Sequence, residues 1–124
     1  MNKQNKHSKK DGIETKGYAY IIIFIILILF DRLTKIWATN LTNKLDLGIL
    51  SFNYVTNTGA GFSILQNMNI LLIWLSIIIL GLLILFYDKF PKISLLLILS
   101  GLIGNLIDRI FLGHVIDFID FKFW

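Results

Sequence analysis

The chain has 124 residues and a formal net charge of +4 at pH 7, and 56% of its residues are hydrophobic against 16% that are charged. This composition, with a mean hydropathy of +0.72, excludes an ordinary soluble domain, because so short a chain has too little interior to bury that much apolar surface. The absence of cysteine excludes disulfides, thiolate catalysis and thiolate metal sites. The two histidines, His7 and His114, lie far apart in the sequence, so we expect neither a metal nor a cofactor.

The basic residues gather in front of the first apolar segment. Five lysines lie in residues 1–17, which are otherwise polar, and we predict a poorly ordered tail there. A nucleic-acid-binding surface would need basic residues on a structured face with aromatic residues among them, so we expect no nucleic-acid partner. A signal for membrane topology is the simpler interpretation.

Three apolar segments follow, and we predict a membrane-spanning helix near residues 18–38, 69–87 and 93–112. Each has a length close to the roughly 20 residues that cross the hydrocarbon core of a bilayer. The first segment also resembles a cleavable signal peptide, but no small-residue cleavage site follows it, and its helical pattern continues through the charged residues near its end. We therefore predict an all-α integral membrane protein whose first helix is retained.

The segment between the first two helices, residues 39–68, is too long to be a mere connector. Residues 48–55 indicate one or two short strands in it, and residues 57–61 indicate a turn. The segment has one lysine, against five in the tail and two in residues 88–92. The positive-inside rule therefore places the N-terminus and residues 88–92 in the cytoplasm, and the long loop and the C-terminus outside.

Polar residues gather at the outer ends of the first and third helices. Asp31 and Lys35 are spaced four residues apart and can pair. Asn105, Asp108 and Arg109 share one face of the third helix. Charges at membrane depth are costly and tend to face a cavity or one another, so these residues indicate a polar site at the outer membrane face.

Two neighbouring features have a plainer interpretation. Arg32 is interpreted as a charge that only marks where the first helix leaves the lipid. Ser100 and Gly104, four residues apart, either let two helices approach closely or are ordinary small-residue filling.

Carboxylates without a thiol or a metal favour the chemistry of an aspartic protease. Two carboxylates held close together share one proton, so that one activates water as a base and the other protonates the leaving amide. A serine mechanism is disfavoured, because Ser51, Ser63 and His114 do not lie in a nucleophile-like setting.

Three sequence motifs resemble, in the same order, those of the lipoprotein signal peptidase (signal peptidase II) family. They are Asp31-x-x-Thr34-Lys35, Asn57-Thr58-Gly59-Ala60-Gly61-Phe62, and Gly101 to Arg109 followed by Gly113 to Phe118. The resemblance covers the chain from about residue 31 to its end. It implies an aspartic endopeptidase of the bacterial cytoplasmic membrane, which removes signal peptides from diacylglyceryl-modified prolipoproteins at the outer face.

The resemblance also assigns roles to individual residues. Asp117 matches one of the two catalytic aspartates. The matched positions that line or brace the site are Asp31, Lys35, Asn57, Gly59, Gly101, Asn105, Asp108, Arg109 and Val115. In this comparison, Arg109 orients carboxylates, Asn57 hydrogen-bonds the substrate backbone, and the diacylglyceryl chains of the substrate stay in the membrane lipid.

The sequence departs from the family's pattern in two places. Gly61 stands where the family usually has alanine. The family continues with a Phe-Asn-x-Ala-Asp motif, which supplies the second catalytic aspartate, and with a fourth helix, whereas this sequence stops at Trp124. Asp120 does not match that aspartate, so we expect little or no peptidase activity from residues 1–124 alone. A fragment of an active enzyme is favoured over an inactive relative or an enzyme completed by a separate polypeptide.

The alternative from another class is a non-catalytic small membrane protein, such as a channel component or an assembly factor. In that case Asp108 and Arg109 would form a structural pair.

Overall fold

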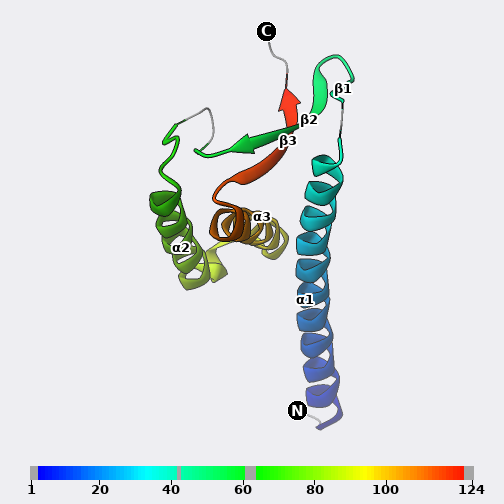
Figure 1. The fold of residues 1–124 in the computed structure, drawn as a ribbon. Helices are drawn as coiled ribbons and strands as arrows, with labels where there is room; N and C mark the ends of the chain where they lie inside the picture. Colours follow the sequence, from blue (N-terminus) through cyan, green and yellow to red (C-terminus); the bar gives the residue numbers. More distant parts are fainter. Residues whose placement is uncertain (1–2, 42, 61–63, 122–124) are drawn as a thin grey trace.

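The computed structural model describes residues 3–41, 43–60 and 64–121. Within these ranges the chain forms helices with a small antiparallel sheet at one end (Figure 1). In chain order the elements are α1 (Lys3–Thr39), β1 (Leu45–Asp46), β2 (Leu50–Asn57), α2 (Asn69–Leu85), the 3₁₀ helix η2 (Tyr87–Lys89), α3 (Lys92–Leu112) and β3 (Val115–Phe121).

The first helix extends further toward the N-terminus than the sequence suggested. α1 begins at Lys3 instead of near residue 18, so the tail predicted to be poorly ordered is helical. Once a helix is nucleated, each further residue adds a hydrogen bond at little cost, and residues 3–17 contain no proline that would end it. At its other end, the side chains of Thr39 and Asn40 donate hydrogen bonds to the carbonyl of Ile36, which would otherwise lack a helical partner.

The ends of α3 follow from two residues with special backbone conformations. Pro91, with φ of −55°, precedes the first turn, where its missing N–H is not needed. Gly113 adopts a left-handed conformation with φ of 80°, and its N–H donates to the carbonyl of Arg109 at 3.2 Å. This turn reverses the chain immediately after the helix and directs β3 toward β2.

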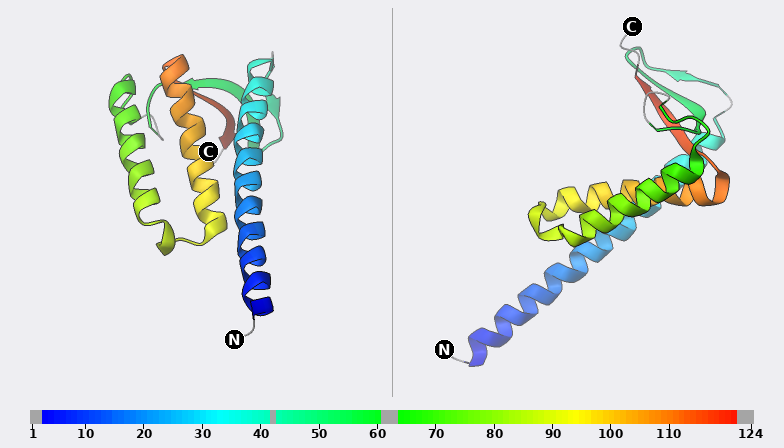
Figure 2. Two further views of the ribbon diagram at one scale, coloured as in Figure 1. Left: turned by 90° about the horizontal axis from the view of Figure 1, so that it is seen from below. Right: turned by 90° about the vertical axis from the view of Figure 1, so that its left-hand side faces the viewer.

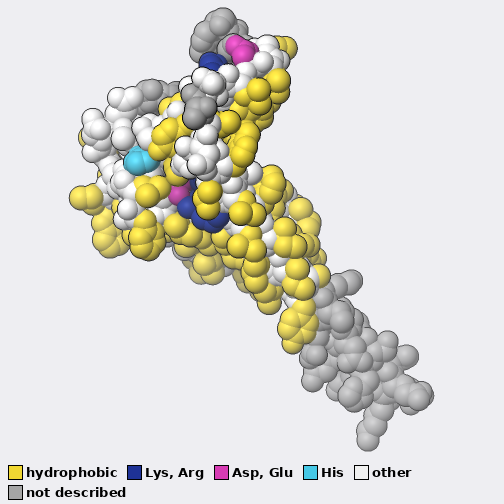
Figure 3. All heavy atoms as spheres, turned by 45° about the vertical axis from the view of Figure 1, so that its right-hand side comes forward, with side chains coloured by type: hydrophobic (Ala, Val, Ile, Leu, Met, Phe, Trp, Pro, Cys, Tyr) yellow, Lys and Arg dark blue, Asp and Glu magenta, His cyan; other side chains and the backbone are white. Residues whose placement is uncertain are grey.

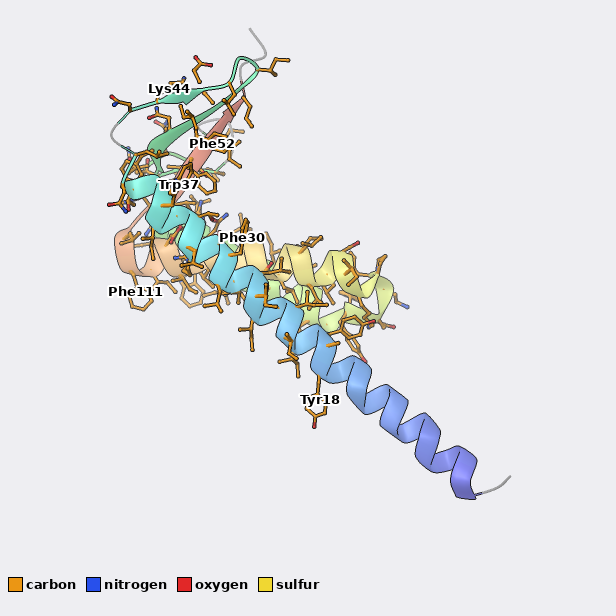
Figure 4. The ribbon with its side chains drawn as sticks, turned by 90° about the vertical axis from the view of Figure 1, so that its right-hand side faces the viewer. Tyr18, Phe30, Trp37, Lys44, Phe52 and Phe111 are labelled. Carbon is orange, nitrogen blue, oxygen red and sulfur yellow. The ribbon has the colours of Figure 1, made fainter. Side chains whose placement is uncertain are left out.

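α3 lies between α1 and α2, and the sheet lies against the C-terminal end of α1 (Figure 2). β2 pairs antiparallel with both β1 and β3. The edge of the Trp37 ring meets Phe52 of β2, with 6.0 Å between the ring centroids (Figure 4). The helices therefore form one layer, and the sheet covers the end at which α1 and α3 carry their charged residues.

The β2–β3 ladder corrects the prediction of an all-α protein whose strands belong only to the 39–68 loop. The C-terminal segment forms β3, which pairs Val115 with Asn57 and Asp117 with Val55. The register shifts by one residue between Phe52 and Val55, so β2 contains a bulge. Local periodicity could not reveal this strand, because its partner lies about 60 residues away in the sequence.

The distribution of polar and apolar side chains is the reverse of that in a water-soluble protein. Large apolar side chains on the helices are exposed, such as Ile70 (74%) and Phe111 (79%), and they cover the visible face of the helices in Figure 3. Lys35, Asp108 and Arg109 are buried instead. This arrangement fits a protein whose solvent is lipid.

The described part of the chain contains one helix, α3, that is both long and apolar enough to cross a membrane. α2 is apolar but shorter, at 17 residues. The prediction of three membrane-spanning helices therefore stays a prediction.

Candidate active site

Four charged residues from α1 and α3 form a partly buried cluster, which we call the charge cluster: Asp31, Arg32, Lys35 and Asp108. The guanidinium of Arg32 donates to Asp31 Oδ2 through Nε (3.1 Å) and Nη2 (2.6 Å), and to Asp108 Oδ1 through Nη1 (2.5 Å). Lys35 Nζ lies 2.7 Å from Asp108 Oδ2 and 3.3 Å from Asp31 Oδ1. Within this cluster the two cations balance the two anions, which makes the burial of Asp108 (0% exposed) tolerable.

The interpretation of Arg32 as a mere boundary charge was wrong. Its side chain bridges α1 and α3, because besides the two carboxylates it also binds the carbonyl oxygen of Gly104 at 2.8 Å. The spacing within α1 revealed the Asp31–Lys35 pair, whereas Asp108 lies 76 positions from Arg32. Lys35 also donates to Asn105 Oδ1 at 3.0 Å, which brings that predicted site residue to the cluster.

α3 passes close to the charge cluster at Gly104. A Cβ atom there would overlap the carboxylate of Asp31, whereas a Cβ at Gly101 on the same helix would meet nothing within 4 Å. At Gly104 the interpretation as a close-approach position is thereby favoured over filling, whereas for Ser100 the two interpretations stay open.

Gly104→Ala is therefore expected to lower the free energy of unfolding by about 1–3 kcal/mol, because the added methyl group displaces Asp31 from its cations. Gly101→Ala is the matched control and is expected to be neutral or to stabilise by about 0.5–1 kcal/mol, as alanine does inside helices. Reversible unfolding of the purified protein in detergent measures both. Equal effects of the two substitutions would contradict the proposed close approach.

Two residues near the C-terminal end of α3 make hydrogen bonds to the β2 and β3 segments. The carboxylate of Asp108 accepts a hydrogen bond from the backbone N–H of Ile116 in β3 at 3.3 Å. The next residue, Arg109, donates from Nη2 to the carbonyl oxygen of Gly59, just after β2, at 2.8 Å. Asp108 and Arg109 therefore do not pair with each other, but each fixes one strand to the helix.

Asp117 lies on β3 and is oriented by Asn57 at the end of β2. Asn57 Nδ2 donates to Asp117 Oδ2 at 2.8 Å, while Asn57 Oδ1 accepts the N–H of Gly59 at 2.9 Å. Because the Gly59 N–H binds the amide oxygen, the amide NH₂ points at the carboxylate. Gly59 is tightly enclosed, since a Cβ there would lie 2.6 Å from the carbonyl oxygen of Ile64.

A hollow of about 300 Å³ lies beside Asp117, and it is lined by Asn53, Val55, Asp117, Phe118 and Ile119. The bulge in β2 falls at this hollow, where Asn53 lies between the two parts of the ladder. Asp117 is half-buried, so its carboxylate faces both the protein and open space. A carboxylate in this position can contact water and a peptide chain laid in the hollow.

The structure brings most of the predicted site residues together in two adjoining groups. Asp31, Lys35, Asn105 and Asp108 lie at the charge cluster, and Asn57, Gly59, Arg109, Val115 and Asp117 lie where α3 meets β2 and β3. Gly101 is exposed and contributes to neither group. Gly61, Phe62 and Ser63 lie outside the described residues. Among the residues that are described, no group of histidine and acidic side chains is placed to hold a metal ion.

Comparisons with known proteins identify the family. The family model described as signal peptidase (SPase) II matches residues 23–124. The lipoprotein signal peptidase of Clostridioides difficile (strain 630) is 39% identical over 115 residues, which cover 83% of this chain and 76% of the relative. The lipoprotein signal peptidase of Clostridium tetani (strain Massachusetts / E88) is 41% identical over 118 residues, which cover 83% of this chain and 73% of that relative. The lipoprotein signal peptidase of Nostoc punctiforme is 40% identical, and the match covers 86% of this chain and 75% of that relative.

A bacterial membrane enzyme structure solved by the in meso method at 2.3 Å resolution superposes on the chain with a TM-score of 0.74 and 28% identity. The match covers 85% of this chain and 71% of that one. The fold and this neighbour together define a bacterial membrane enzyme. The chain belongs to the signal peptidase II family and is an aspartic peptidase of that type. The resemblance of its motifs to this family is thereby confirmed.

Proposed function

We propose that this protein removes signal peptides from lipid-modified prolipoproteins at the outer face of the bacterial cytoplasmic membrane. The observation that carries the proposal is the half-buried Asp117 carboxylate, which Asn57 orients beside an open hollow. The names of the similar lipoprotein signal peptidases support the substrate class.

In the proposed topology, α1, α2 and α3 each cross the membrane, with the N-terminus in the cytoplasm. The exposed apolar side chains along α1 and α2 support this, as do the lysines of the N-terminal segment and of the turn between α2 and α3. Both α1 and α3 then end at the outer face, where the charge cluster lies. The sheet follows the same end of α1 (Figure 4). The diacylglyceryl chains of the substrate stay in the outer leaflet, which holds the scissile bond at the level of the sheet.

In the proposed chemistry, two carboxylates share one proton. One takes a proton from the attacking water, and the other delivers its proton to the leaving nitrogen, so that no covalent intermediate forms. Asp117 is one of these carboxylates. The second is the aspartate expected from the Phe-Asn-x-Ala-Asp motif of the family, and that assignment stays a prediction.

A synthetic precursor peptide with a diacylglyceryl cysteine tests both the substrate class and the orientation. Spheroplasts that make the enzyme as its gene encodes it are expected to cleave the added peptide before the modified cysteine, which mass spectrometry identifies. Sealed inverted vesicles are expected to leave it intact until detergent opens them.

The same peptide with an unmodified cysteine is the control, and we expect no cleavage of it. Equal cleavage of the two peptides would contradict the proposed substrate class. Faster cleavage by sealed inverted vesicles than by spheroplasts would contradict the proposed orientation.

A further inference from the structure

Arg32 makes more polar contacts across the α1–α3 interface than its place in the sequence suggested. The first motif of the family leaves this position open. Yet all three nitrogens of the guanidinium donate hydrogen bonds: Nε and Nη2 to Asp31, Nη1 to Asp108, and Nη2 also to the carbonyl oxygen of Gly104. A planar fork of five donors can serve three acceptors at once, which an ammonium group cannot do in a fixed geometry.

Asp108 connects Arg32 to the strand that carries the reactive carboxylate. Its Oδ1 accepts from Arg32, while its Oδ2 contacts Lys35 and accepts from the N–H of Ile116. The two oxygens belong to one rigid carboxylate, so the bond to Arg32 fixes the plane in which the other oxygen meets Ile116.

β3 needs such a fixed partner because, among the described strands, it lies at the edge of the sheet. Alternate N–H groups of an edge strand point away from its neighbour and find no partner in the ladder. Ile116 is the residue before Asp117, and its N–H donates to the carboxylate of Asp108. The position of β3 at Asp117 is therefore set from one side by the ladder with β2 and from the other by Asp108.

We propose that Arg32 is a positioning residue for Asp117, acting through Asp108 and the backbone of Ile116. This inference rests on the proposed function, because Asp117 is taken as the reacting carboxylate. Loss of the guanidinium fork would leave Asp108 free to turn toward Lys35 and would loosen the strand next to Asp117.

The test uses Arg32→Lys in the full-length enzyme, since this change keeps the positive charge of the cluster and removes only the fork. We expect kcat for a lipidated peptide to fall by up to about 100-fold with KM little changed, as for a misplaced catalytic group. We also expect the N–H of Ile116 to exchange its hydrogen faster than in the wild-type enzyme. This readout does not depend on cleavage. Lys89→Arg is the matched control, because it swaps one cation for another at the exposed turn, where Lys89 lies 3.7 Å from Asp88. Both readouts should stay unchanged in this variant.

Three results would overturn the inference. One is unchanged kcat in Arg32→Lys. Another is a lower kcat with unchanged exchange at Ile116, because the effect would then not pass through β3. The third is a higher KM with unchanged kcat, which would assign Arg32 to substrate binding. Full cleavage by Asp117→Asn would instead refute the assignment of Asp117 as the reacting carboxylate, and no cleavage of the lipidated peptide by the wild-type enzyme would refute the proposed function. In both cases the exchange at Ile116 would still report on the contact itself. If Arg32→Lys unfolds, Arg32→Gln, which keeps a planar donor without the charge, replaces it with the same expected readouts.

Discussion

Asp117→Asn is expected to lower the rate of cleavage of a lipidated peptide by about 100- to 10,000-fold, the range that removal of a general acid or base produces. Asparagine cannot take a proton from water or share one with a second carboxylate. It has nearly the same shape as aspartate, and its amide oxygen can still accept the hydrogen bond that Asn57 now donates to Asp117 at 2.8 Å. The substitution therefore removes the chemistry and keeps the contacts.

The measurement is single-turnover cleavage by the full-length enzyme in membranes, together with its unfolding temperature. Asp88→Asn is the matched control, since Asp88 is exposed in the turn before α3 and touches neither group of site residues. We expect wild-type cleavage from the control and an unchanged unfolding temperature from both variants. Retention of full cleavage by Asp117→Asn would refute the role of Asp117 as a catalytic carboxylate.

Asp108→Ala is expected to lower the free energy of unfolding by about 3–5 kcal/mol, the usual loss when one partner of a buried ion pair is removed. Asp108 is fully buried and contacts both Arg32 and Lys35, so its removal leaves the cluster with an unbalanced cation. It also leaves the N–H of Ile116 without its acceptor. Reversible unfolding in detergent measures the loss. Asp88→Ala removes an exposed ion pair and should cost at most about 1 kcal/mol.

The double variant Arg32→Met with Asp108→Ala separates charge balance from packing. It removes one cation and one anion and leaves Asp31 paired with Lys35, whose atoms lie 3.3 Å apart. We expect it to be more stable than Asp108→Ala alone, because the remaining charges cancel. If the losses of the two single variants simply add in the double variant, the charges do not interact and the cluster is not held together by charge balance.

The chemistry of the site was largely readable from the sequence, because it depends on residue types at short spacings. The motif around Asp117 and the four-residue spacing of Asp31 and Lys35 indicated a carboxylate site at the outer end of the helices. The role of Arg32 was not predicted, because its partners Asp108 and Gly104 belong to another helix. Asn57 was assigned to the substrate backbone, whereas in the structure its amide donates to Asp117.

The sequence by itself determined that the chain contains long apolar helices and belongs in a membrane, since long runs of apolar residues favour burial in lipid. It also determined that the costly charges gather at the ends of the helices near residues 31 and 108. Only the tertiary structure decided that residues 115–121 form a strand against β2 and that Asp108 holds this strand. The physical reason is that helix formation is set by hydrogen bonds four residues apart, whereas strand pairing and buried ion pairs depend on how distant segments pack.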